Sequence, residues 1–123
     1  MTGTAHPFRL SRRQYSLGKN RNYQYVYRKG KSFPSRHMVL IYLPYREIRV
    51  GYSVSSKVGN AVVRNRIRRY LREDFRLLRP GLKPGRYIFA ARTSAKEAAH
   101  GVLTGDIRQA LKRAKLFEAE QKP

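Results

Sequence analysis

The sequence has 123 residues, enough for one domain with a single core, and it carries 28 Lys and Arg against 7 Asp and Glu, a net charge of +21. Such a surplus destabilises a compact monomer by self-repulsion and attracts it to anionic surfaces, whereas the 41% of hydrophobic residues excludes a disordered basic tail. The chain has no cysteine, which excludes disulfides and thiolate metal sites.

The N-terminal part is predicted to contain an arm and one short helix. Residues 1–16 are polar and basic without a sustained period, and we predict a flexible arm there. A helix is predicted from Lys19 to Lys29, where Asn20 can cap the first turn. Tyr23 and Tyr27 lie one turn apart on this helix. Two such tyrosines either pack in the core or form a platform on which unpaired bases stack.

Three runs rich in β-branched and aromatic residues are predicted to be strands. Arg36–Leu43 and Arg49–Val54 are separated by a polar turn, and together they predict a hairpin. In the second run Gly51 and Ser53 leave one face shallow, so that another layer or a ligand strand can approach it. Arg86–Ala91 comes after a long helix, and we expect it to join the same sheet.

A helix of about five turns is predicted between the second and third of these strands. Gly59 and Asn60 mark its start, since the Asn60 side chain can cap free backbone N–H groups, and no Pro or Gly interrupts the chain before Leu78. At about 100° per residue, one side of this helix is apolar and is expected to pack inward. That side carries Val63, Ile67, Tyr70, Leu71, Phe75 and Leu78. Asp74 projects toward the same side, for which the sequence offers no reason.

The opposite side of this helix is basic. It carries Asn65, Arg68, Arg69, Arg72 and Arg76, with Arg64 and Arg66 on its two flanks, and these seven residues are called the arginine face below. Without a partner, like charges three and four residues apart cost about a few tenths of a kcal/mol per pair, and guanidinium groups fit phosphate oxygens. A charge run of this kind can be a merely solvated helix face. The scarcity of acids that could neutralise it favours nucleic-acid binding.

The C-terminal third is predicted to contain a turn and two helices. Residues 80–85 form a connector rich in Pro and Gly, and a modest helix is expected at Ala95–His100. A last helix is predicted from Thr104 to Phe117, with its apolar residues on one stripe. Residues 118–123 are expected to be a frayed end.

The acids and histidines do not indicate catalysis by protein side chains. Only Glu73 and Asp74 are close in sequence, and adjacent helical residues diverge by about 100°, so no set of acids converges as a two-metal nuclease requires. His6, His37 and His100 show no ligand spacing. We therefore predict no catalytic residue and no metal ligand in the protein. The sequence also lacks a signal segment and an apolar run of membrane-spanning length, which predicts a cytoplasmic protein.

Residues 53–73, SVSSKVGNAVVRNRIRRYLRE, closely resemble the signature of the bacterial ribonuclease P protein subunit, which joins a catalytic RNA to remove the 5′ leader of precursor tRNA. The residues in the family's order are Lys57, Gly59, Asn60, Ala61, Val62, Arg64, Asn65 and Arg66. The resemblance extends over residues 17–117. It implies an α+β single-domain α/β sandwich, in α-β-β-α-β-α order, whose βαβ crossover is left-handed where chain chirality would favour the right-handed form.

The resemblance also implies which residues bind RNA. Those expected to meet the catalytic RNA and the region near the cleavage site are Lys57, Asn60, Arg64, Asn65, Arg66, Arg68, Arg69 and Arg72. Ser56 stands where a second lysine is usual. Tyr23 and Tyr27 fall where the family places aromatics lining a cleft for the single-stranded leader. Ile41 stands where some members have a further cleft tyrosine, which leaves Phe33, Tyr42 and Tyr52 as candidates for that role.

Under this interpretation the protein screens phosphate repulsion and holds the leader, while Mg²⁺ bound mainly by the partner RNA performs the hydrolysis. The predicted partners are the catalytic RNA and precursor tRNA, with a monomeric protein in a 1:1 ribonucleoprotein and no membrane. Three alternatives stay open. They are a structural RNA-binding protein of ribosomal type with no role in processing, a DNA-binding module with the basic helix in a major groove, and a self-sufficient nuclease. The second lacks a helix-turn-helix context and the third lacks converging acids.

Overall fold

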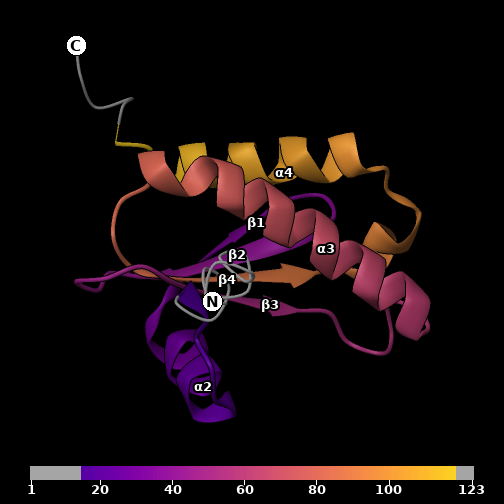
Figure 1. The fold of residues 1–123 in the computed structure, drawn as a ribbon, viewed down its shortest axis with the longest axis horizontal. Coiled ribbons are helices and arrows are strands. Elements are labelled where there is room, and N and C mark those ends of the chain that lie inside the picture. Colours follow the sequence, from indigo (N-terminus) through magenta and orange to yellow (C-terminus); the bar gives the residue numbers. More distant parts are fainter. Residues whose placement is uncertain (1–14, 119–123) are drawn as a thin grey trace, which may run out of the picture.

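The computed structural model describes residues 15–118 and folds them into helices on both faces of one four-stranded sheet (Figure 1). Its helices and strands are α2 (Asn20–Lys29), β1 (Lys31–Pro34), β2 (Met38–Leu43), β3 (Arg49–Ser53), α3 (Ala61–Leu78), β4 (Arg86–Ala91) and α4 (His100–Arg113). In Figure 1, α3 and α4 cover one face of the sheet and α2 lies on the other. The predicted α+β architecture is confirmed. Residues 1–14 of the predicted arm and 119–123 of the predicted frayed end lie outside the described residues.

The strands pair in the order β1-β2-β4-β3, so the predicted hairpin of Arg36–Leu43 with Arg49–Val54, which correspond to β2 and β3, is wrong. β4 lies between them, antiparallel to β2 and parallel to β3. It takes the central place because its residues are buried on both faces: Tyr87 and Phe89 toward α3 and α4, and Ile88 toward α2. The parallel pairing of β3 and β4 across α3 confirms that Arg86–Ala91 joins the same sheet. The hand of this crossover stays a prediction.

The edge strand β1 was not predicted from the sequence. Its four residues, KSFP, are mostly exposed and include a proline, both of which are tolerated only at the edge of a sheet. Lys31 pairs with Tyr42, and Pro34 pairs with Val39. The strand therefore depends on a neighbouring strand for its conformation, and its own sequence carries little β signal.

Two cores lie on the two faces of the sheet. The larger core joins the sheet to the apolar side of α3 and to α4, and its buried members include Leu40, Phe89, Ile67, Leu71, Phe75 and Leu111. The smaller core consists of Leu17, Val26, Ile41 and Ile88 under α2. This division follows from strand geometry, in which successive side chains point to opposite faces.

Helix α3 begins and packs as predicted. The Asn60 side chain accepts a hydrogen bond from the backbone N–H of Val63 at 3.0 Å, which caps the helix. Ile67, Leu71 and Phe75 are buried on its inner side. Because these residues hold one side of α3 against the sheet, its arginine face points away from the core. None of the described helices has both the length and the apolar character of a membrane span.

The two predicted C-terminal helices differ from those observed. A short 3-10 helix at Thr93–Glu97 replaces the predicted Ala95–His100 helix. Helix α4 starts at His100 instead of Thr104 and ends at Arg113 instead of Phe117. The early start is stabilised by Leu103, which is fully buried, whereas two exposed glycines in the first turns weaken the helical signal in the sequence. Lys115, with a φ of 60°, turns the chain out of the helix.

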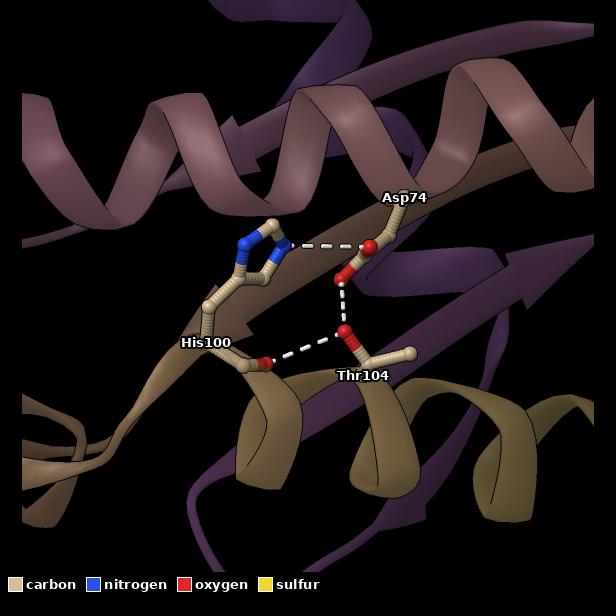
Figure 2. A network of polar contacts seen from close by, with 3 residues as sticks. All are labelled: Asp74, His100 and Thr104. Atoms are coloured by element: carbon tan, nitrogen blue, oxygen red, sulfur yellow. Dashed lines mark hydrogen bonds and ion pairs between the residues drawn. The ribbon is translucent and has the colours of Figure 1, made fainter.

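Asp74 on the inner side of α3 has two partners on α4 (Figure 2). Its Oδ1 lies 3.1 Å from His100 Nε2, and its Oδ2 accepts a hydrogen bond from the Thr104 hydroxyl at 2.8 Å. The Tyr70 ring stacks on the His100 imidazole with centroids 4.3 Å apart. These contacts are called the Asp74 network below. They explain the acid that the sequence left unexplained, since a buried carboxylate needs hydrogen-bond donors.

Candidate nucleic-acid interface

Among the described residues, most side chains of the arginine face have no acidic partner. Arg64 Nε donates to the Gly59 carbonyl oxygen at 3.1 Å, and Arg66 Nη2 donates to the Lys96 carbonyl oxygen at 2.9 Å. Arg68 donates to Asn65 Oδ1 at 3.2 Å and to the Val54 carbonyl oxygen at 3.4 Å. All these acceptors are neutral, so they orient the guanidinium groups without cancelling their charge.

The rest of the predicted RNA-binding residues lie around the same helix. Asn65 and Arg69 are exposed, and the Arg69 guanidinium lies 5.6 Å from the centre of the Tyr70 ring. Lys57 and Asn60 are exposed just before α3 begins. In residues 15–118, Arg64, Arg66, Arg68 and Arg69 form no ion pair with a carboxylate. The interface is therefore strongly positive, as a polyanion site requires.

A pocket of about 360 Å³ lies beside this face, where α2, β3 and α3 come together. Its lining consists of Gly18, Asn20, Tyr23, Tyr52, Ser53, Val54, Ser55 and Arg68, and we call it the tyrosine pocket. Arg68 belongs to both the pocket and the arginine face. The two predicted sites, one aromatic and one basic, are therefore adjacent in space although they are far apart in the sequence.

The surroundings of the two tyrosines of this pocket favour the neutral phenol further. Burial raises the pKa of Tyr23, and a hydrogen bond with the Tyr52 backbone opposes this only in part. Burial also raises the pKa of Tyr52, whereas the positive charge of Arg72 lowers it. The Arg72 guanidinium lies 5.8 Å from the Tyr52 ring centre. A neutral phenol beside cations can stack with a base or hydrogen-bond it without repelling phosphate.

The other predicted cleft aromatics are not all brought together. Tyr27 is 43% exposed on α2, within one turn of Tyr23. Phe33 pairs with Leu40 and packs in the core under α3 and α4, on the opposite face from α2. The Tyr42 ring lies on that face too, 5.0 Å from the Tyr87 ring. Tyr52 packs on that face as well, but it lies on the edge strand β3, which lines the pocket, whereas Phe33 and Tyr42 lie on β1 and β2 away from that edge.

Several residues that line the tyrosine pocket were not predicted as site residues. The sequence also indicated only in part how Gly51, beside the pocket, affects the position of Tyr23. Gly18 lies in a loop outside any motif, and Ser55 lies inside the signature segment without an assigned role, so only the fold shows that both line the pocket. Gly51 was predicted to leave a shallow face. Tyr23 occupies that space, because a Cβ on Gly51 would lie 2.4 Å from Tyr23 Cε2. The absence of a side chain at Gly51 therefore sets the position of the Tyr23 ring.

Replacing Gly51 with alanine is expected to displace Tyr23 and to lower the free energy of unfolding by about 1–3 kcal/mol, the usual cost of overpacking. Chemical denaturation measures the loss of stability. The control is Gly101→Ala on α4, where nothing lies within 4 Å of the added Cβ. Equal stability of the two variants would show that Tyr23 moves freely and that Gly51 does not position it.

The acids and histidines of the described residues lie apart from one another or have partners within the fold. In residues 15–118, no group of three or more His, Asp or Glu side chains comes close enough to hold a metal ion. His37 Nδ1 lies 2.8 Å from the Ser94 hydroxyl, and His100 belongs to the Asp74 network. The chemistry that the interface offers is the binding of phosphate by arginine and the stacking of bases on tyrosine.

Comparisons with known proteins find one family, in sequence and in fold. The sequence profile of the family Ribonuclease P matches residues 11–115. A ribonuclease P protein component from an Exiguobacterium species is 39% identical over 111 residues, which cover 89% of this chain and 97% of the relative. The solved RNase P protein of Staphylococcus aureus is 35% identical, with a TM-score of 0.79 over 84% of this chain and 97% of that one. The RNase P protein of Thermotoga maritima, at 23% identity and a TM-score of 0.69, covers 76% of this chain and 91% of its own and shares the fold.

Proposed function

Since the chain belongs to the ribonuclease P protein family, we propose that it acts by binding RNA on the arginine face and in the tyrosine pocket. It is a protein component of the endonuclease that removes the 5′ leader of precursor tRNA. The observation that carries the proposal is the shared position of Arg68. Through it, a surface suited to a folded RNA continues into a pocket suited to an unpaired strand.

We assign the catalytic RNA to the arginine face and the leader to the tyrosine pocket. Guanidinium groups reduce the repulsion between the two RNA chains, and Tyr23, Tyr27 and Tyr52 provide ring surfaces for leader bases. The described residues offer no carboxylate cluster for Mg²⁺, so we assign the ions and the hydrolysis to the RNA. The protein then contributes affinity and positioning, as one copy per catalytic RNA in the cytoplasm.

A comparison of two ligands tests this function. The complex of the protein with its catalytic RNA is expected to bind precursor tRNA at least about fivefold more tightly than mature tRNA, because one stacked leader base contributes about 1–3 kcal/mol. Equilibrium binding at fixed salt measures the ratio. The catalytic RNA without protein serves as the control and is expected to discriminate less.

Equal affinity of the complex for precursor and mature tRNA would contradict the leader site. It would favour a structural RNA-binding protein that shares the basic charge but needs no pocket for a single strand. Cleavage of precursor tRNA by purified protein and Mg²⁺ without any RNA subunit would contradict the assignment of catalysis to the RNA.

A further inference from the structure

The side of α2 that faces away from the sheet carries an aromatic residue between two arginines. Arg21, Tyr25 and Arg28 follow one another at four- and three-residue spacing, so at about 100° per residue they form one stripe along the helix. The Arg28 guanidinium lies 5.9 Å from the centre of the Tyr25 ring. We call these three residues the outer stripe. Tyr25 is about 200° away from Tyr23 around the helix, on the side opposite the tyrosine pocket.

Packing within the protein does not explain the outer stripe. Val26 anchors α2 to the sheet and is fully buried, whereas Tyr25 is 43% exposed and Arg21 and Arg28 are exposed. Among the described residues, α2 is the only α-helix on its face of the sheet, so no other described helix covers its far side (Figure 1). A tyrosine left in solvent between two arginines adds nothing to the core.

The charge around the outer stripe is entirely positive. The segment 19–31 contains Lys19, Arg21, Arg28, Lys29 and Lys31 and no Asp or Glu. In the described residues, ion pairs occur at Arg49 and at His100, and neither residue belongs to α2. The stripe therefore offers phosphate-binding donors on either side of an exposed ring. Proteins combine cations and aromatic rings in this way to hold unpaired nucleic acid.

We propose that the outer stripe binds nucleotides of the 5′ leader that lie beyond those in the tyrosine pocket. The inference rests on the proposed leader site, because the same short helix carries Tyr23 and Tyr27 on its other side. A strand that leaves the pocket across α2 reaches Arg21, Tyr25 and Arg28 without leaving the helix. The exposed ring favours an unpaired strand over a lipid headgroup or an acidic peptide, for which the arginines alone would be enough.

The length of the leader distinguishes binding at the outer stripe from binding in the tyrosine pocket. Two precursor tRNAs are compared. One has a short leader that ends in the tyrosine pocket, and the other has a long, unpaired leader that extends beyond it. The affinity of the reconstituted complex is measured for each. The wild-type complex is expected to bind the long-leader RNA more tightly. Tyr25→Leu is expected to weaken binding of the long-leader RNA on the order of five- to a hundredfold, the range for loss of one stacked base, and to leave short-leader binding unchanged.

The arginines are tested by salt dependence. Arg21→Gln with Arg28→Gln is expected to reduce the log–log salt slope for the long-leader RNA by about 1.4, or about 0.7 per phosphate contact on a single strand. The matched control is Arg108→Gln with Lys112→Gln, which removes the same charge from exposed positions of α4 across the sheet. Tyr25→Phe keeps the ring and is expected to retain affinity.

Two results would overturn the inference. Equal losses for short- and long-leader RNA would place the contact on another part of the complex, and equal effects of the α2 and α4 charge variants would reduce it to general electrostatic attraction. Failure of the proposed function looks different, because the wild-type complex would then fail to distinguish precursor from mature tRNA at any leader length. Far-UV circular dichroism verifies that each variant keeps its helices.

Discussion

Replacing Arg64, Arg68 and Arg72 with alanine is expected to weaken binding of the catalytic RNA by about a thousandfold or more at moderate salt. Each arginine presents a charge-assisted donor to phosphate, and a hydrogen bond to a charged group contributes about 1.5 kcal/mol or more. If about six phosphates are neutralised at about 0.7 each, the log–log salt slope is on the order of −4, and the triple variant is expected to show about −2. Titration of the RNA at several salt concentrations measures both quantities.

The control for this prediction removes equal charge elsewhere. Arg92, Arg108 and Lys112 are exposed and lie outside α3, so their replacement by alanine is expected to change the slope much less. Arg68 bonds to the Val54 carbonyl and Arg72 lies over Tyr52, so thermal unfolding must show that the triple variant stays folded at the binding temperature. An unchanged slope in a folded triple variant would place the RNA on a different face.

Replacing Asp74 with alanine is expected to lower the free energy of unfolding by about 2–4 kcal/mol. The side chain is 7% exposed and joins α3 to the first turns of α4 through His100 and Thr104. Its removal takes away both polar contacts between α3 and α4, leaves His100 Nε2 without its partner in a partly buried site, and leaves the Thr104 hydroxyl only the His100 carbonyl oxygen as acceptor. Urea denaturation monitored by circular dichroism measures the change.

Glu73→Ala is the matched control for Asp74. It removes a carboxylate one position away on the same helix, from a partly exposed side chain, and is expected to change stability by no more than about 0.5 kcal/mol. Substitution by alanine gains roughly a few tenths of a kcal/mol more helix propensity at Asp74 than at Glu73, so a larger loss of stability at Asp74 is a lower bound on the contribution of the Asp74 network. Equal stabilities would show that the contacts in Figure 2 contribute nothing in solution.

The basic helix was predictable because its determinants are local. Asn60 caps it, the apolar residues repeat at three- and four-residue spacing, and the arginines occupy the remaining side. These signals are contained within one short segment, and burial of the apolar side alone directs the arginine face outward. The outer stripe of α2 is directed outward in the same way, by burial of the opposite side of its helix. Its direction is known only once the structure shows that Val26 is buried.

Strand pairing could not be predicted, because it depends on contacts between distant segments. The polar turn between β2 and β3 resembles a hairpin connection, yet β4 separates these two strands in the sheet. The preference of Tyr87, Ile88 and Phe89 for burial on both faces outweighs the short connection. The same topology places Tyr52 on the edge strand β3 beside α2, and Phe33 and Tyr42 on β1 and β2 away from that edge, which no spacing along the chain reveals.

The sequence by itself therefore determined the charge, the exposed arginine face and the family, because each is written in composition or within a few turns of one helix. Only the tertiary structure showed which aromatic residues share a pocket, that the Tyr23 ring fills the space beside Gly51, and that Asp74 binds His100 and Thr104. These features join residues from different elements, and their distances depend on which strands pair and which side chains fill the two cores. The physical reason is that hydrophobic burial, which selects the arrangement of the elements, is summed over the whole chain, whereas capping and helical periodicity act within one segment.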